Sequence, residues 1–146
     1  MMQTTVPALV IRRTFAAAPQ RVYEAWTNPD LAKEFLCPAG VTVGEVKMDV
    51  RPGGAYKIEM LHENNETFVA YGTYTEVVPA SRLVMRWKWQ EDNPADEHET
   101  RLTLEFLPHG SGTQLILTHE NLASLESREN HEHGWTTLLE KLDALR

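Results

Sequence analysis

The amino-acid sequence predicts an α+β fold in which one antiparallel sheet of about six to seven strands lies against a long C-terminal helix. Three observations indicate this architecture. Residues 19–35 carry apolar side chains at helical spacing, and residues 41–119 consist of short runs rich in β-branched and aromatic residues. Residues 124–146 then close the chain with a second, longer helical pattern.

Length and composition favour a single globular domain, which we expect to span residues 1–146. Of the 146 residues, 42% are hydrophobic and 24% are charged. The net charge of −7, with scattered basic residues, argues against nucleic acid as a partner. The sequence has no leader pattern and no run of about eighteen apolar residues, so we expect a cytoplasmic protein without membrane insertion. The single Cys37 excludes an internal disulfide.

The first strand is predicted over Leu9–Phe15, and two short helices follow it. Their apolar side chains recur at helical spacing at Val22, Tyr23, Trp26, Leu31 and Phe35. Asn28 and Pro29 separate the two helices, because asparagine is a good N-cap and proline is favoured in the first helical turn. Pro38 then predicts a loop before the next strand.

Six further strands are predicted, each separated from the next by a gap short enough for a hairpin. The runs are Val41 to Val50, Ala55 to Leu61, Thr67 to Val78, Arg82 to Gln90, Glu99 to Leu107 and Thr113 to His119. Between the first two of these runs, Pro52 and Gly53 predict a type II turn. Proline presets the first central residue of such a turn, and glycine adopts the positive φ of the second.

Alternation of apolar and polar residues predicts that one face of the sheet is buried and the other is wet. Leu83, Met85, Trp87 and Trp89 share one face, and Arg82, Val84, Arg86 and Lys88 share the other. The strand from Thr67 to Val78 is apolar on both faces, so either Tyr71 or Tyr74 can point inward. The apolar face requires a cover, which the C-terminal helix supplies.

The C-terminal helix is predicted from Ser124 to Arg146, with Ser124 as its N-cap. Its apolar stripe consists of Trp135, Leu138, Leu139, Leu142 and Leu145. Gly134 lies inside this helix, where glycine costs about 1 kcal/mol relative to alanine. It therefore indicates a close approach of either the sheet or a ligand, and we favour close packing.

Five segments together resemble those of a known family, both in amino-acid sequence and in their order along the chain. They are RTFAAAPQRVYEAWTNPDLAKEF, DVRPGGAY, GTYTEVVPASRLVMRWKW, GSGTQLILTHENL and HEHGWTTLLEKL, which begin at residues 13, 49, 72, 110 and 131. The chain resembles the activator of heat-shock-protein-90 ATPase homologue (AHSA-type) branch of the START-like (SRPBCC) superfamily. The resemblance implies a helix-grip fold, in which a strongly curved sheet grips the C-terminal helix and leaves a cavity between them. Phe35 stands where this branch normally carries a tryptophan.

The candidate lining of that cavity consists mainly of aromatic and methionine side chains, and apolar side chains of this kind typically line small-molecule sites. It comprises Met60, Tyr74, Met85, Trp87, Trp89, Phe106, His119, His131 and Trp135. The alternative is that these side chains simply fill the core. His119 and His131 are candidates to hydrogen-bond a ligand or to act as general acid and base, and the alternative, which the residue types favour, is that they are satisfied core or rim residues.

Neither a metal site nor a bound cofactor is predicted. His131 and His133 are two residues apart on a helix and therefore point about 200° away from each other, so they cannot share one metal ion. The sequence has no glycine-rich nucleotide-binding pattern. Ser111 lies in a hairpin turn and lacks the strand-to-helix elbow that exposes a nucleophile.

Three classes of function follow. The favoured one is binding of a small apolar or amphipathic molecule in the cavity. The second is an enzyme of polyketide cyclase or hydrolase type, as relatives in the superfamily are, with His119, His131, Tyr74 or Glu76 as acid or base. The third is a co-chaperone or protein-interaction module, which the resemblance to activators of the heat-shock-protein-90 ATPase implies. The sequence leaves open whether the protein forms a homodimer.

Overall fold

The computed structural model describes residues 6–38 and 40–145. The chain runs in the order β1 (Leu9–Phe15), α1 (Pro19–Thr27), α2 (Pro29–Phe35), β2 (Val41–Met48), β3 (Ala55–His62), β4 (Thr67–Val78), β5 (Arg82–Trp89), β6 (Thr100–His109), β7 (Gly112–Glu120) and α3 (Leu125–Leu142). A short 3₁₀ turn, η1 (Pro94–Asp96), lies between β5 and β6. This is the order of elements that the sequence predicts.

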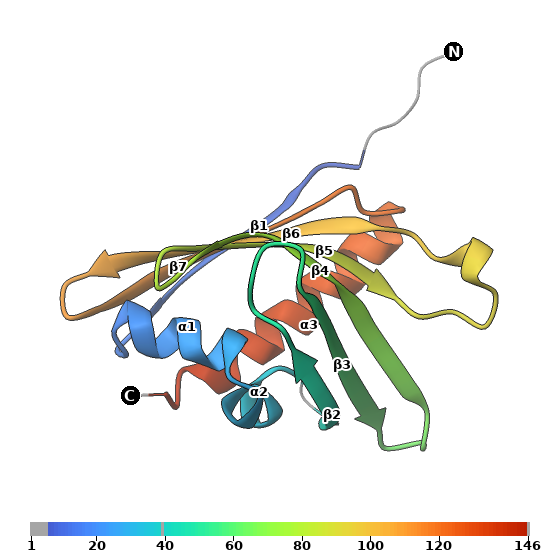
Figure 1. The fold of residues 1–146 in the computed structure, drawn as a ribbon, viewed down its shortest axis with the longest axis horizontal. Helices are drawn as coiled ribbons and strands as arrows, with labels where there is room; N and C mark the ends of the chain where they lie inside the picture. The colour runs from blue at the N-terminus through green and yellow to red at the C-terminus, as the bar shows by residue number, and fades with distance from the viewer. Residues whose placement is uncertain (1–5, 39, 146) are drawn as a thin grey trace, which may run out of the picture.

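The strands form one seven-stranded antiparallel sheet with the order β1-β7-β6-β5-β4-β3-β2. Figure 1 shows the sheet arching over α3, with all three helices on its concave side. The predicted α+β fold, with a curved sheet wrapped around the C-terminal helix, is confirmed. The concave face and α3 together enclose the core.

The concave face of β5 is buried as the alternation predicts, because Leu83, Met85 and Trp87 are each at most 3% exposed. The convex face of the sheet is not exposed to solvent at every position. Val84 and Thr103 are cross-strand partners on that face, and both are buried. The long side chains of the Arg82–Glu105 and Arg86–Arg101 pairs flank them on the same face and shield them from water.

The turn between β2 and β3 has the predicted type II geometry. Gly53 has a φ of +83°, and the Gly54 amide donates to the Arg51 carbonyl at 2.8 Å. The turn is also bonded to β4, since the Gly53 amide donates to the Tyr74 carbonyl at 2.7 Å and the Tyr74 amide donates to the Gly54 carbonyl at 2.9 Å. A Cβ atom on Gly54 would lie 1.9 Å from the Asp49 carbonyl oxygen, so this position requires glycine.

The caps of the helices follow the predicted chemistry. The Asn28 side chain accepts a hydrogen bond from the Asp30 amide, and the Ser124 hydroxyl oxygen accepts one from the Ser127 amide, both at 3.0 Å. Helix α3 ends at Leu142 rather than at Arg146, which lies outside the described residues. After Leu142 the backbone forms i→i−3 hydrogen bonds, and this tighter turn places Leu145 in the core.

The strand ends differ slightly from the predicted ones. β2 ends at Met48 instead of Val50, because the chain already turns after Asp49, where the Arg51 amide donates to the Asp49 carbonyl at 2.9 Å. β6 and β7 extend to a tighter hairpin, in which His109 pairs with Gly112. These shifts change no side-chain face in the buried part of the sheet.

Segments from the two ends of the chain lie together. β1 pairs along its whole length with β7, so that Leu9 is opposite His119. The Arg128 guanidinium of α3 donates to the carbonyls of Pro7 and Ala8 at 3.1 and 3.3 Å. The first described strand is therefore held by elements from the last third of the sequence.

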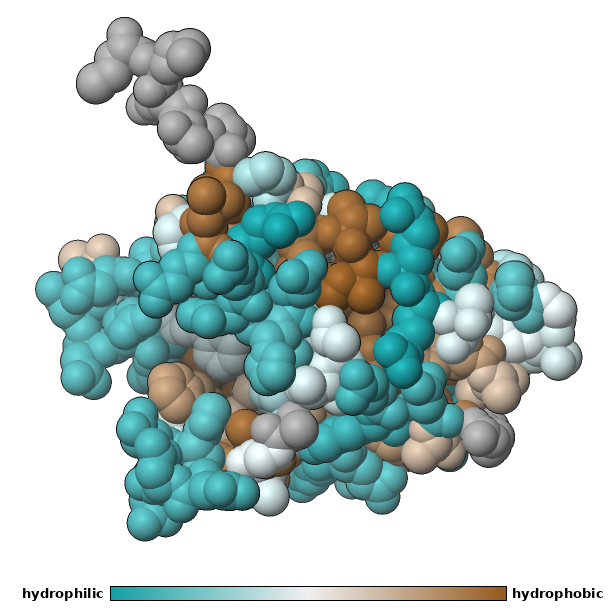
Figure 2. Space-filling model, turned by 180° about the vertical axis from the view of Figure 1, so that it is seen from behind, coloured by the Kyte–Doolittle hydropathy of each residue, from teal (hydrophilic) through white to brown (hydrophobic). Residues whose placement is uncertain are grey.

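The surface is predominantly polar, in keeping with the net charge of −7. Figure 2 shows the face opposite to the view of Figure 1, where hydrophilic side chains cover most of the surface and smaller apolar areas lie between them. None of the helices in the described part of the chain combines the length and the apolar character needed to cross a membrane.

Candidate functional site

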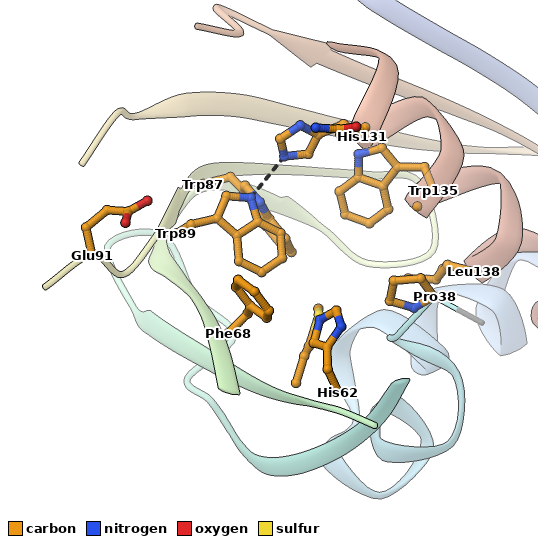
Figure 3. Close-up of a pocket in the computed structure, with 12 residues that line it drawn as sticks. Pro38, His62, Phe68, Trp87, Trp89, Glu91, His131, Trp135 and Leu138 are labelled. Carbon is orange, nitrogen blue, oxygen red and sulfur yellow. Dashed lines mark hydrogen bonds between the residues drawn. The ribbon is translucent and has the colours of Figure 1, made fainter. Parts of the chain in front are cut away.

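A pocket of about 470 Å³ opens between the concave face of the sheet and the middle of α3. Figure 3 shows its walls, with aromatic side chains on one side and α3 on the other. The lining residues are Pro38, Met60, His62, Phe68, Trp87, Trp89, Glu91, Asn130, His131, Gly134, Trp135 and Leu138. Most of the wall is therefore apolar.

Strand and helix periodicity explain why these residues meet. Met60 and His62 are two apart on β3 and face the same side of the sheet as Phe68, since Met60 pairs directly with Phe68 on β4. On α3, the spacing of three and four residues from Asn130 to Leu138 forms one helical face. Pro38, from the segment between α2 and β2, completes the wall.

A hydrogen bond joins the sheet to the helix at the pocket. The indole Nε1–H of Trp89 donates to Nε2 of His131 at 2.9 Å, as the dashed line in Figure 3 marks. The other ring nitrogen, Nδ1, lies 2.8 Å from the Ser127 carbonyl oxygen and must donate to it. Together these two bonds fix His131 as the neutral tautomer with its proton on Nδ1.

A second indole–imidazole pair lies behind the first, with its imidazole fully buried. Trp135 Nε1–H donates to Nδ1 of His119 at 3.1 Å. Nε2 of His119 lies 2.7 Å from the Thr100 hydroxyl, which itself donates to the Trp87 carbonyl at 2.8 Å. Nε2 of His119 therefore carries the proton and donates to Thr100. The two imidazole rings meet edge to face, with centroids 4.8 Å apart.

Burial keeps both imidazoles neutral. Loss of hydration, with a smaller contribution from the nearby His131, lowers the pKa of His119 to about 3. Loss of hydration also lowers the pKa of His131, and the hydrogen bond to the Ser127 carbonyl partly opposes this effect. The pocket wall thus presents no imidazolium charge from these two residues near neutral pH.

Trp87 is the centre of a ring cluster beneath the pocket. Its centroid lies 5.2 Å from that of Trp135, 5.7 Å from that of Trp89 and 5.9 Å from that of Tyr56. The Trp87 indole nitrogen is buried and has no hydrogen-bond partner among the described residues, and the same holds for the Trp26 indole nitrogen and the Tyr74 hydroxyl. Trp87 itself is therefore held by packing, whereas its neighbours Trp89 and Trp135 are also held by hydrogen bonds.

The structure brings together five of the nine residues that the sequence suggests for the cavity. Met60, Trp87, Trp89, His131 and Trp135 all line the pocket. The other four, Tyr74, Met85, Phe106 and His119, are buried on the concave side of the sheet but lie outside the pocket wall.

Other core elements cover these four side chains. Phe106 packs edge to face against Tyr23 of α1, with ring centroids 5.6 Å apart, and Tyr74 packs against Tyr56 with the rings tilted and their centroids 5.2 Å apart. Tyr74 is the inward tyrosine of β4, at 1% exposure. Tyr71 points outward, where its hydroxyl donates to Glu97.

Sequence reasoning missed Pro38, His62, Phe68, Glu91 and Asn130. A signal existed for two of them. His62 continues the inward alternation of Ile58 and Met60, and Phe68 continues that of Ala70 and Tyr74. Both lie at strand ends beyond the cover of α3, which leaves Phe68 40% exposed at the mouth of the pocket.

Gly134 borders open space and not a packed contact. A Cβ atom at this position would meet only the Cγ atom of Pro38, at 3.9 Å, which is an ordinary van der Waals distance. The expectation of close packing against Gly134 is therefore wrong. Glycine here leaves room in the pocket between α3 and Pro38.

The arrangement offers little for metal binding. Among residues 6–38 and 40–145, no three His, Cys, Asp or Glu side chains come together in a metal-binding arrangement. His131 faces the pocket, whereas His133 is exposed. Glu76, a candidate acid or base from the sequence, lies away from the pocket and pairs with Arg82 at 2.8 Å.

Comparison with known proteins places the chain among similar folds from bacteria. A protein of Chromobacterium violaceum is 29% identical, with 94% of each chain covered and a TM-score of 0.83. A protein of Silicibacter pomeroyi described as AHSA1 is 26% identical, with 94% of this chain and 96% of that chain covered and a TM-score of 0.83.

The human activator of 90 kDa heat shock protein ATPase homolog 1 is 24% identical over 127 residues. That match covers 87% of this chain but 33% of the human protein, so the chain spans about one third of this curated relative. The model of the family "Activator of Hsp90 ATPase homolog 1-like protein" matches residues 16–146. The chain therefore belongs to the Activator of Hsp90 ATPase homolog 1-like protein family.

Proposed function

We propose that the protein binds a small, mainly apolar molecule in the pocket between the sheet and α3. The observation that carries this proposal is an aromatic-walled space of about 470 Å³, with three tryptophans in its lining. Small-molecule sites in proteins typically measure about 300–1,000 Å³ and combine apolar walls with a few polar groups. His62, Glu91 and Asn130 supply such polar groups here.

Hydrogen bonds hold two of the tryptophans in the wall, which favours binding. Trp89 is fixed by its hydrogen bond to His131, and Trp135 by its hydrogen bond to His119. Side chains that are held in place lose little conformational entropy when a ligand arrives. More of the contact energy is then available for affinity.

Catalysis by the groups that the sequence suggests is less well supported. Both ring nitrogens of His131 are hydrogen-bonded, and His119 has 0% exposure. Burial raises the pKa of Tyr74, whose hydroxyl does not reach the pocket. Among these candidates, none presents a free proton-transfer atom to a bound molecule, so binding without turnover is the better hypothesis.

The proposal is tested by filling the pocket from α3. Gly134→Leu places a branched side chain in the space opposite Pro38, and Gly134→Ala is the matched control that adds one methyl group. We expect the neutral dye N-phenyl-1-naphthylamine to bind the wild type and Gly134→Ala with increased fluorescence. Gly134→Leu should bind it about tenfold or more weakly.

Native mass spectrometry of freshly purified protein gives a second readout, in which a co-purifying molecule is present in the wild type and depleted in Gly134→Leu. Equal dye binding by Gly134→Leu and Gly134→Ala, with both variants folded by circular dichroism, would rule out the pocket as the binding site. Absence of dye binding by the wild type would contradict the proposal for molecules of this size.

A second candidate function is contact with a chaperone of the Hsp90 type, which the family and the human relative favour. The test is the steady-state ATPase rate of purified Hsp90 with and without the chain. A rate increase that persists in Gly134→Leu would assign this contact to a surface outside the pocket. An unchanged rate at saturating chain concentration would contradict it.

A further inference from the structure

We propose that the pocket selects organic cations, such as amines or quaternary ammonium compounds with an apolar body, over carboxylates of the same shape. This inference rests on the proposed binding function and specifies the chemical class of its ligand. The juxtaposition that carries it is an aromatic wall next to one unpaired carboxylate, with no lysine or arginine among the described lining residues.

The aromatic rings of the wall favour a cationic ligand. Phe68, Trp87, Trp89 and Trp135 all contribute to the wall, and Figure 3 shows them around one open space. The face of an aromatic ring carries negative electrostatic potential and attracts a cation held within about 6 Å of the ring centre. Trp89 cannot turn its N–H group to an incoming anion, because that group is bonded to His131.

The charged group in the lining also favours a cationic ligand. Glu91 is the one carboxylate among the described lining residues, and it lies at the edge of the pocket beyond Trp89 (Figure 3). By contrast, Glu97 of the same segment lies 4.0 Å from Lys88. The Glu91 side chain has no ion pair within the described ranges, so its charge is available to a cationic headgroup.

An anionic headgroup would find no matching charge in this wall. Nε2 of His131 accepts the indole proton and therefore cannot donate to a carboxylate. The segment 91–99 contains five acidic residues and neither lysine nor arginine, and the turn at 63–66 contains Glu63 and Glu66. Apart from Glu97, which pairs with Lys88, these acidic residues add negative charge to the segments that adjoin the lining residues Glu91 and His62, and such charge favours cations over anions.

The test uses three probes that share the para-tert-butylphenyl body and differ in charge. They are para-tert-butylbenzyltrimethylammonium, para-tert-butylbenzyl alcohol and para-tert-butylbenzoate. Isothermal titration at low salt and about pH 8, where an ordinary imidazole is neutral, gives the three affinities. We expect the cation to bind about tenfold more tightly than the alcohol, and the benzoate to bind more weakly than either.

Substitutions then locate the preference. Glu91→Gln removes the charge with little change in shape, and Asp92→Asn is the matched control for net charge on a neighbouring residue outside the lining. We expect Glu91→Gln to reduce the ratio of cation to alcohol affinity about two- to fivefold, and Asp92→Asn to change it less. Phe68→Leu keeps the wall apolar but removes one ring face, so it should also reduce the ratio.

The outcomes separate the two proposals. If the alcohol binds as tightly as the cation, or the benzoate binds most tightly, the charge preference is wrong while the pocket remains a binding site. If Glu91→Gln and Asp92→Asn lower the ratio equally, the preference reflects net charge and the role assigned to Glu91 is wrong. If none of the probes binds the wild type, the proposed binding function itself fails for ligands of this size.

Discussion

The indole nitrogen of Trp89 and Nε2 of His131 lie 2.9 Å apart and form the one side-chain hydrogen bond that crosses from β5 to α3 at the pocket in the described structure. The indole N–H can only donate, so Nε2 must accept and the imidazole must be neutral. Protonation of His131 would set two donors against each other. The state of this bond therefore depends on pH and on the presence of the indole N–H.

Removing that N–H should make His131 easier to protonate. In Trp89→Phe, Nε2 loses the donor that favours the neutral ring, so we expect the pKa of His131 to rise by about one unit. The measurement is a pH titration of the imidazole C–H signals by NMR. The matched control is Trp26→Phe, because the Trp26 indole nitrogen has no partner among the described residues.

Trp26→Phe should leave the pKa of His131 close to its wild-type value. The His131→Gln variant identifies the signal, which it lacks. An equal rise in both phenylalanine variants would show that loosened packing, and not the hydrogen bond, controls the titration of His131.

Acid should destabilise the fold through His119. Its pKa is lowered to about 3 in the folded protein, whereas an imidazole in the unfolded chain titrates near 6.5. Between these values the unfolded chain binds a proton that the folded protein does not, so the free energy of unfolding falls as the pH falls below about 6.5. We expect a loss of about 2 kcal/mol between pH 7.5 and pH 5.

Urea unfolding at the two pH values measures that loss. His119→Asn retains an acceptor for the Trp135 N–H but cannot be protonated, so it should lose less stability on acidification than the wild type does. His133→Gln, at an exposed position, should behave as the wild type does. A pH dependence in His119→Asn as steep as that of the wild type would contradict the assignment.

Gly134→Ala should stabilise the protein by about 0.5–1 kcal/mol. Alanine restricts the unfolded chain and favours the helix, and its Cβ atom meets only Pro38, at 3.9 Å. The midpoint of urea unfolding should rise with an unchanged slope. A lower midpoint would mean that the space beside α3 is smaller than the structure indicates.

The two glycines of the turn between β2 and β3 should respond differently to alanine. Gly53→Ala meets no other atom within 4 Å but must adopt a φ of +83°, which costs about 1–2 kcal/mol. Gly54→Ala would bring a Cβ atom to 1.9 Å from the Asp49 carbonyl oxygen, so the backbone must move, at a cost of about 2–4 kcal/mol. Thermal unfolding of both variants checks the order, and a larger loss for Gly53→Ala would contradict it.

Most of the fold is predictable from the sequence because local patterns determine it. The alternation of Leu83, Met85 and Trp87 fixes the buried face of β5, and Ser124 marks the start of α3. The burial of Val84 was not predictable, since it depends on long side chains from neighbouring strands that come together only in the sheet.

The pocket was only partly predictable for a related reason. Alternation shows that Met60, Phe106 and Trp87 all face inward, but it does not show how far along the sheet each helix reaches. Helix α1 covers Phe106 through Tyr23, whereas Phe68 is 40% exposed. The hydrogen bond between Trp89 and His131 was not predictable either, because the two residues are 42 positions apart in the sequence and lie on different elements.

The pairing of β1 with β7 has a consequence for how the protein forms in the cell. Among the strands of this sheet, Leu9–Phe15 is synthesised first, yet its partner strand, Gly112–Glu120, is synthesised last. β1 therefore stays unpaired while the successive hairpins from β2 to β7 form. The sheet can therefore be completed only after residue 120 has left the ribosome, and a pause in synthesis before residue 112 would leave β1 without its partner.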